Sequence, residues 1–194
     1  MHIKKNFQST GHIRIIGGQW RGYNLSVLNN PGLRPTTDRM RETLFNWLDP
    51  VIQNARCLDC FAGSGSLGLE ALSRGASNAT LLEINRAASI QLTKNIQFLT
   101  VVMSAKVITT DTLYWLMQPG ETFDVIFIDP PFYQGIVENV ITLLEQYKRL
   151  ADKSWIYIET EVEKIIPNLA SCWQLHREKL TRNVAYRLYV RRLY

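Results

Sequence analysis

Four acidic residues stand where apolar segments of the chain give way to turns, and carboxylates at such positions can bind cationic ligands. The first, Asp59, opens a glycine-rich segment that ends at Gly68 and reads DCFAGSGSLG. Glycines in such a turn allow positive φ angles and let a ligand approach main-chain N–H groups at the start of a helix. The segment predicts a strand, a ligand-binding turn and a helix, although the same glycine spacing also occurs in turns that bind nothing.

The acid before this turn argues against a dinucleotide. A nearby carboxylate would repel the pyrophosphate in a partly desolvated crevice. S-adenosylmethionine has no phosphate and carries an ammonium and a sulfonium group. Further acids, Glu83, Asp111 and Asp129, follow later predicted strands, and parallel strands end at one edge of a sheet. We predict S-adenosylmethionine as the cofactor, with Asp59 near its amino group, Glu83 at its ribose hydroxyls and Asp111 at its adenine amino group.

The last of these acids begins the segment DPPF, Asp129 to Phe132. Two successive prolines remove two N–H donors and fix two φ angles, so they make a stiff turn. Such a turn would direct the Asp129 carboxylate and the Pro130 carbonyl outward as acceptors beside the Phe132 ring. The segment predicts a site for a planar amine, such as the exocyclic amino group of a base, rather than a purely structural turn.

Charge is distributed unevenly along the chain. The net charge is +5, but residues 1–41 carry +6, residues 174–194 carry +5, and the middle of the chain carries −6. Basic ends suit a polyanion such as a nucleic acid, and an acidic centre suits a cationic cofactor. The alternative is that these arginines are only solvated surface residues.

Composition limits the class of protein. A chain of 194 residues with 46% apolar side chains is long enough for one globular domain with a small appendage. No run reaches the roughly 18 apolar residues of a membrane span, and the first ten residues lack the apolar centre of a signal peptide. We expect a cytoplasmic monomer without a membrane association. There are three cysteines, and the CxxC pair Cys57 and Cys60 is expected to be two buried structural thiols rather than a redox or zinc site, for which the sequence supplies no partners; no metal site is predicted.

The N-terminal part predicts two elements before the glycine turn. Residues 12–25 alternate in a way that indicates a hairpin with Gly17 and Gly18 as its turn. Its residues Gln19, Trp20, Arg21 and Tyr23 would offer an aromatic and basic surface for unpaired bases; the alternative is that the hairpin merely caps the domain. Residues 34–48 predict an amphipathic helix that opens with a proline and a threonine or aspartate cap.

The rest of the chain alternates between strands and helices. The segment 123–128, FDVIFI, is apolar on both faces, as a central parallel strand should be. Further strands are predicted at 79–84, 106–110 and 154–160, with a closing hairpin at 173–180 and 184–191. Helices are predicted at 67–74, 86–99, 113–116 and 135–150, followed by a short irregular helix at 162–169.

Four segments together resemble one protein family. They are IRIIGGQWRG (13–22), LRPTTDRMRETLFNWL (33–48), LDCFAGSGSLGLEALSRG (58–75) and DPPF. They resemble the bacterial RsmD family of class I S-adenosylmethionine-dependent methyltransferases, which methylate N2 of one guanine in 16S ribosomal RNA. The resemblance spans residues 12–192, and the two N-terminal segments make it specific, because DPPF alone would also fit adenine-N6 or cytosine-N4 enzymes.

The resemblance implies a fold and a set of site residues. The fold is an α/β Rossmann-like domain (34–194) with a seven-stranded sheet of order 3-2-1-4-5-7-6 and strand 7 antiparallel, preceded by a basic tail and hairpin (1–33). The cofactor pocket would be lined by Asp59, Ala62, Gly63, Gly65, Glu83, Asp111 and Thr112, and the target base would be held by Asp129, Pro130, Pro131 and Phe132. The candidate RNA contacts are Arg14, Trp20, Arg21, Arg34, Arg39, Arg41 and Arg182; Arg182-Asn183 stands where relatives often carry a glycine.

The predicted function is direct methyl transfer to the N2 amino group of a guanine in 16S rRNA, within the small ribosomal subunit or an assembly intermediate. Three alternatives remain open on the residues alone. They are methylation of adenine N6 or another nucleic-acid amine, a nicotinamide-dependent reaction using the same glycine turn, and a non-catalytic RNA-binding module.

Overall fold

Strands and helices alternate from Arg56 to Glu161, which is the pattern of a parallel sheet joined by crossover helices. The protein is described by a computed structural model, which covers residues 10–28, 37–132, 134–164, 166 and 169–193. The strands are β1 (Thr10–Arg14), β2 (Asn24–Leu28), β3 (Arg56–Asp59), β4 (Asn78–Glu83), β5 (Ala105–Thr109), β6 (Phe123–Ile128), β7 (Leu150–Glu161), β8 (Trp173–Leu180) and β9 (Val184–Arg192). The helices are α1 (Asp38–Ile52), α2 (Ser66–Ser73), α3 (Arg86–Phe98), α4 (Thr112–Leu116) and α5 (Ile136–Gln146).

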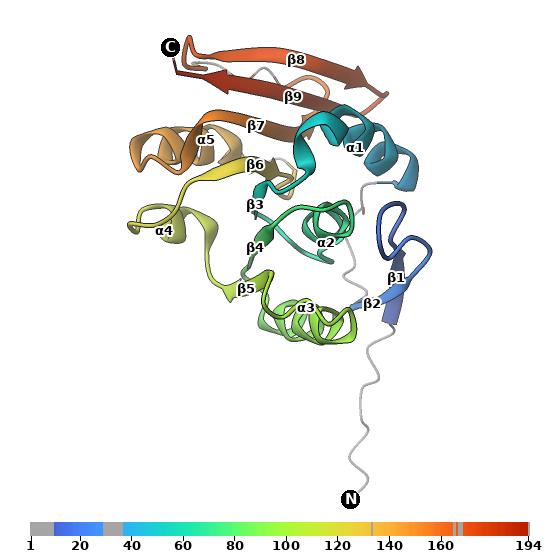
Figure 1. Ribbon diagram of the computed structural model, residues 1–194. Helices are drawn as coiled ribbons and strands as arrows, with labels where there is room; N and C mark the ends of the chain where they lie inside the picture. The colour runs from blue at the N-terminus through green and yellow to red at the C-terminus, as the bar shows by residue number, and fades with distance from the viewer. Residues whose placement is uncertain (1–9, 29–36, 133, 165, 167–168, 194) are drawn as a thin grey trace, which may run out of the picture.

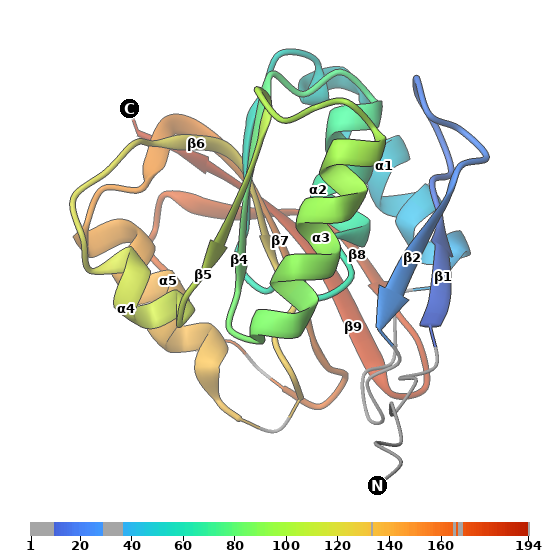
Figure 2. The same ribbon diagram turned by 90° about the horizontal axis from the view of Figure 1, so that it is seen from below.

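Seven of the strands form one sheet in the order β5-β4-β3-β6-β7-β9-β8. The five strands from β5 to β7 run parallel, and β9 pairs antiparallel with both β7 and β8. Helices α1, α2 and α3 cover one face, and α4 and α5 cover the other (Figures 1 and 2). The predicted strand order, with one antiparallel strand, is confirmed.

The two faces of the sheet carry separate apolar clusters. Along β6, Val125 and Phe127 pack with α1, α2 and α3, whereas Ile126 and Ile128 pack with α4 and α5. All four side chains are fully buried. The central strand is therefore apolar on both faces, as its sequence predicts.

Several element boundaries differ from the predicted ones. Helix α1 begins after Thr37, whose hydroxyl accepts the Met40 N–H at 3.4 Å, and it continues past Leu48 to Ile52. Strand β7 begins at Leu150 because this residue pairs with Phe123 of β6, so α5 ends earlier than the sequence suggests. The described residues of 162–169 contain no helix, so the predicted irregular helix is wrong there. No helix in the described part of the chain is long and apolar enough to cross a bilayer.

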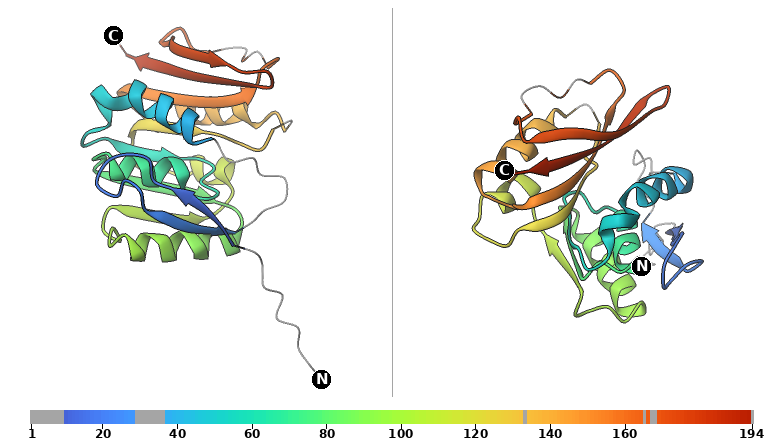
Figure 3. Two further views of the ribbon diagram at one scale, coloured as in Figure 1. Left: turned by 90° about the vertical axis from the view of Figure 1, so that its right-hand side faces the viewer. Right: turned by 45° about the horizontal axis from the view of Figure 1, so that its top comes forward.

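The N-terminal hairpin differs from the prediction at its turn. Strands β1 and β2 pair from Thr10 with Leu28 to Arg14 with Asn24, and residues 15–23 form a long connection that packs on α2 (Figure 3). Gly18 has φ +73°, and a Cβ atom there would come within 1.8 Å of the Ser73 carbonyl oxygen. The glycine is thus required by the close approach of two backbones and not by a two-residue hairpin turn.

Candidate active site

Acidic residues gather at the carboxyl edge of the sheet. In β3, Asp59 pairs with Leu81 of β4 and with Phe127 of β6. Since side chains two residues apart share a face of a strand, Asp59, Glu83 and Asp129 belong to the face covered by α1, α2 and α3. The structure therefore brings together three of the acids that the sequence analysis singled out.

Asp59 is a buried carboxylate at this edge, 1% exposed. The Gly68 N–H donates to its Oδ2 at 3.1 Å, and its Oδ1 makes no hydrogen bond to a described residue. Burial, with smaller contributions from the nearby charges of Asp129 and Glu83, raises the pKa of Asp59 to about 7 against the opposing Gly68 hydrogen bond. A cationic group beside Oδ1 would stabilise the ionised form.

Glu83 connects the end of β4 to the glycine turn. Its Oε2 accepts the Gly63 N–H at 2.7 Å, and its Oε1 accepts the Asn85 N–H at 2.7 Å. A carboxylate has about four acceptor positions, so both oxygens can still accept hydroxyl groups. The side chain is half-buried, which leaves it accessible to a ligand at the edge.

The glycine turn itself is shaped by close packing. Gly65 has φ +80°, and a Cβ there would come within 2.4 Å of the Leu92 side chain. The Ala62 N–H donates to the Leu82 carbonyl at 2.9 Å, and Gly65 donates to Ala62. These contacts hold Ala62, Gly63 and Gly65 beside the end of β4.

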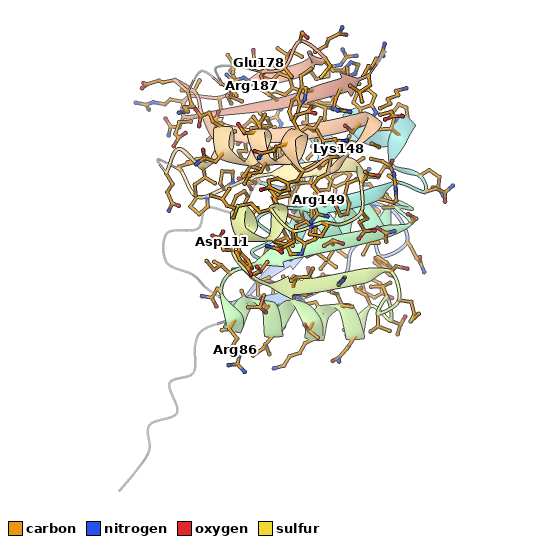
Figure 4. The ribbon with its side chains drawn as sticks, turned by 90° about the vertical axis from the view of Figure 1, so that its left-hand side faces the viewer. Arg86, Asp111, Lys148, Arg149, Glu178 and Arg187 are labelled. Atoms are coloured by element: carbon orange, nitrogen blue, oxygen red, sulfur yellow. The ribbon has the colours of Figure 1, made fainter. Side chains whose placement is uncertain are left out.

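The two predicted cofactor residues after β5 also act within the fold. Asp111 is exposed at the start of α4, where its Oδ1 accepts the Tyr114 N–H at 2.9 Å (Figure 4). The buried Thr112 hydroxyl donates to the Cys60 carbonyl. Asp111 therefore caps α4, Thr112 ties α4 to the turn after β3, and a contact of either side chain with a cofactor stays a prediction.

The DPPF turn borders a cavity of about 470 Å³. Pro130 is buried, Pro131 is exposed and Phe132 packs partly against the apolar cluster under α1. The cavity continues along the end of β7, where it is lined by Glu159, Thr160 and Glu161. A planar ring that carries hydrogen-bonding groups could enter here between the turn and the end of β7.

Two of the predicted RNA contacts are buried. Trp20 is 8% exposed in the apolar core, and its N–H donates to the Ser73 hydroxyl at 3.0 Å. Arg41 is 2% exposed and donates to Asp38 at 2.6 Å and to the Arg14 carbonyl at 2.8 Å. The prediction of an exposed surface is wrong for both, because these side chains join the hairpin and α1 to the domain.

The other basic residues divide into three groups. Arg14 and Arg39 are exposed, near the start of α1, and Arg182 is exposed in the turn before β9, whose first residue pairs with Glu161 at the carboxyl edge. Arg21 is exposed too, but its connection packs near the C-terminal end of α2, far from the glycine turn. Arg34 lies outside the described residues.

Cys57 and Cys60 fit the buried structural role predicted for this pair. Cys57 and Cys60 are free and fully buried, and burial raises the pKa of both thiols. Cys172 is free and half-buried. Within the described ranges, no three His, Cys, Asp or Glu side chains cluster as metal ligands would.

Two buried glutamates escaped the sequence analysis. Glu70 is fully buried in α2 and accepts the N–H groups of Ile16 and Gly17, each at 2.8 Å. Glu159 is 5% exposed at the end of β7. Each interrupts an apolar run, LGLEALS or WIYIET, and an acid in such a run is the signal that could have revealed it.

Comparison with known proteins agrees with this fold. A family model described as "Conserved hypothetical protein 95" matches residues 13–190. The chain is 56% identical over 188 residues to Ribosomal RNA small subunit methyltransferase D of Escherichia coli K12, covering 97% of this chain and 94% of that protein. It is 50% identical over 182 residues to the protein of the same name in Haemophilus influenzae, covering 92% and 94%.

Solved structures give the same result. A putative methyltransferase from E. coli, YhhF, superposes with a TM-score of 0.88 at 56% identity, covering 94% of this chain and 99% of that one. A putative methyltransferase complexed with SAH has a TM-score of 0.69 at 12% identity, covering 98% and 58%. The second likeness concerns the fold alone. From the family match and the high identity to its relatives, we conclude that the chain belongs to the bacterial RsmD family of methyltransferases.

Proposed function

We propose that this protein transfers a methyl group from S-adenosylmethionine to the N2 amino group of a guanine in 16S rRNA of the small ribosomal subunit. The relatives that share about half of its residues are named as small-subunit rRNA methyltransferases. The observation that carries the proposal is the proximity of the DPPF turn to the buried acid Asp59, since Asp59 pairs with Phe127 of β6 and DPPF begins two residues later. A base held at DPPF would thus lie beside a ligand held at Asp59.

The residues of the edge fit the cofactor. Asp59 Oδ1 is a buried carboxylate oxygen without a hydrogen bond among described residues, which suits an ammonium group. Glu83 has acceptor capacity for two ribose hydroxyls, and the Gly65 position has no room for a side chain. When bound, S-adenosylmethionine supplies a methyl group that is already activated on a sulfonium.

The protein's own residues then have to position an amine. The Asp129 carboxylate and the Pro130 carbonyl accept its two N–H groups, which directs the nitrogen lone pair toward the methyl donor. The Phe132 ring supports the face of the base. As the new N–C bond forms, the methyl–sulfur bond breaks and S-adenosylhomocysteine would leave as a neutral thioether. The amino nitrogen becomes acidic and loses one proton to Asp129 or to water, so no strong base is needed.

The test is the identity of the product. Undermethylated small ribosomal subunits are incubated with the protein and S-adenosylmethionine labelled in its methyl group, and the RNA is digested to nucleosides. Label in N2-methylguanosine is the expected result. Label in N6-methyladenosine would show that the substrate is adenine and not guanine. The absence of any transferred label would favour a non-catalytic RNA-binding protein.

A further inference from the structure

The acidic row at the carboxyl edge extends one strand beyond the predicted site. Ile128 of β6 pairs with Ile158 of β7, so the residues that follow them, Asp129 and Glu159, are neighbours at the ends of two parallel strands. Glu159 shares a face of β7 with Tyr157, which pairs with Phe127. Glu159 therefore lies on the face that carries Asp59 and Asp129, next to DPPF and on the side away from the glycine turn.

The Glu159 carboxylate is buried and oriented. It is 5% exposed, and it lines the same cavity as Pro130, Pro131 and Phe132. The Tyr157 hydroxyl donates to its Oε2 at 3.1 Å. Burial and the charges of Glu159 and Asp129 raise the pKa of Tyr157 well above its usual value, so the phenol keeps its proton and stays a donor. Glu159 consequently presents a fixed acceptor to the cavity.

The chemistry of this acceptor distinguishes one base from the others. On the edge next to its amino group, guanine carries a second donor, the N1–H. Adenine and cytosine carry an unprotonated ring nitrogen at the corresponding place, and a buried carboxylate would repel its lone pair. Neighbouring strands lie about 4.8 Å apart, so acceptors at the ends of β6 and β7 can face one edge of one base.

We propose that Glu159 determines the specificity for guanine by accepting the N1–H of the target base while Asp129 and Pro130 hold the N2 amino group. This inference rests on the proposed function. It assigns to Glu159 a contact with the ring nitrogen, and to Tyr157 the positioning of the Glu159 carboxylate. The DPPF turn by itself fits any planar amine, and the contact with Glu159 explains how the site selects guanine among the bases that carry one.

The experiment uses 2-aminopurine, which keeps the amino group of guanine, lacks the O6 carbonyl and has a lone pair in place of the N1–H. Small subunits are reconstituted with guanine or with 2-aminopurine at the position that the parental protein methylates, and single-turnover rates are compared. The parental protein should prefer guanine by roughly 10⁴ to 10⁵-fold, as expected for a site built to pair a hydrogen-bond donor. Equal rates on the two bases would overturn the proposal while leaving guanine-N2 methylation intact.

Two variants test whether Glu159 is the residue that discriminates guanine from 2-aminopurine. Glu159→Gln keeps the shape of the side chain and adds an amide donor that can pair with an unprotonated ring nitrogen, so the preference for guanine should fall by at least about tenfold. Glu163→Gln removes an equal charge from an exposed side chain that lines the same cavity, and its preference should match the parental one. An unchanged preference in Glu159→Gln would also overturn the proposal. If this variant does not fold, the parental comparison still tests the proposal, because equal rates on the two bases would overturn it.

Discussion

The Gly63 N–H lies 2.7 Å from Glu83 Oε2, so the glycine turn after β3 is tied directly to the acid that ends β4. One carboxylate thereby shapes the turn and keeps acceptor capacity for a ligand. The two functions cannot be changed separately, because the removal of the carboxylate also leaves the Gly63 N–H without its partner.

Glu83→Ala should weaken binding of S-adenosylhomocysteine by about 1.5 to 3 kcal/mol, because charge-assisted hydrogen bonds to the ribose are lost. Titration calorimetry measures this directly. Glu121→Ala, which removes an exposed acid before β6 at the other end of the sheet, should leave the affinity unchanged. Binding of NAD with no response to S-adenosylhomocysteine would contradict the cofactor assignment.

Asp59 should make the stability of the ligand-free protein fall as pH rises. Its pKa is about 7 in the folded state against 3.8 as its ordinary value. The folded state therefore holds this proton more tightly, and the stability that it contributes is fully present below about pH 4 and lost as pH rises through 7. Asp59→Asn should raise the melting temperature relative to the parental protein at pH 7.5 more than at pH 5, by several degrees. The exposed control Asp152→Asn should show no such divergence.

The same group should control cofactor binding with the opposite pH dependence. An ammonium group pairs with the ionised form of Asp59, so affinity for S-adenosylhomocysteine should increase up to tenfold per pH unit between about pH 5 and 7. Asp59→Asn should bind more weakly at pH 7.5 and show a flat profile. If the affinity of the parental protein does not change with pH, Asp59 does not bind the amino group of the cofactor.

Two residues of the DPPF turn have different expected roles: Asp129 accepts hydrogen bonds from the amine, and Phe132 stacks on the base. Asp129→Ala should lower the single-turnover transfer rate by about two orders of magnitude or more, with cofactor affinity largely kept. Phe132→Ala should cost about 1 to 3 kcal/mol in RNA binding, and Phe132→Tyr should keep most of it. Transfer by Asp129→Ala at the parental rate would make DPPF a structural turn.

The exposed basic residues near the acidic edge should contribute to salt-dependent RNA binding. Replacement of Arg14, Arg39 and Arg182 by Ala should reduce the slope of log affinity against log salt by about 0.7 for each lost phosphate contact. The control replaces Lys106, Lys148 and Lys153, which are exposed toward the amino ends of the strands, with the same change in net charge; Figure 4 shows Lys148 away from Asp111. Equal slopes for the two triple variants would indicate that only total charge matters.

Gly18→Ala should destabilise the fold by roughly 2 to 4 kcal/mol, because the methyl group would overlap the Ser73 carbonyl. Gly22→Ala is the matched control. Gly22 also has positive φ, +89°, but nothing lies within 4 Å of its Cβ position, so only the backbone penalty of about 1 kcal/mol remains. Urea denaturation of both variants measures the difference in their free energies of unfolding. Similar decreases would mean that the close contact of Gly18 with the Ser73 carbonyl does not set the cost of the substitution.

Sequence patterns were sufficient for the sheet and for the acids at its edge. Alternation, glycine turns and strand-end acids are local signals, and they predicted the individual strands and the grouping of Asp59, Glu83 and Asp129, whereas the strand order followed from the family resemblance. These local signals did not predict the burial or the role of a side chain whose partner is distant in the sequence. Arg41 looked exposed because its pairing with the Arg14 carbonyl links segments 27 residues apart. Glu159 was missed because its place beside Asp129 follows from the pairing of β7 with β6, which the residues around Glu159 do not reveal.

The docking of residues 15–23 on α2 has a consequence for the order of events during synthesis. The Glu70 and Ser73 groups that hold Ile16, Gly17 and Trp20 lie 53 to 56 residues later in the chain. A ribosome adds about 5 to 20 residues per second, so these partners emerge seconds after the N-terminal segment. Residues 15–23 must therefore wait for a helix made later before their native contacts can form.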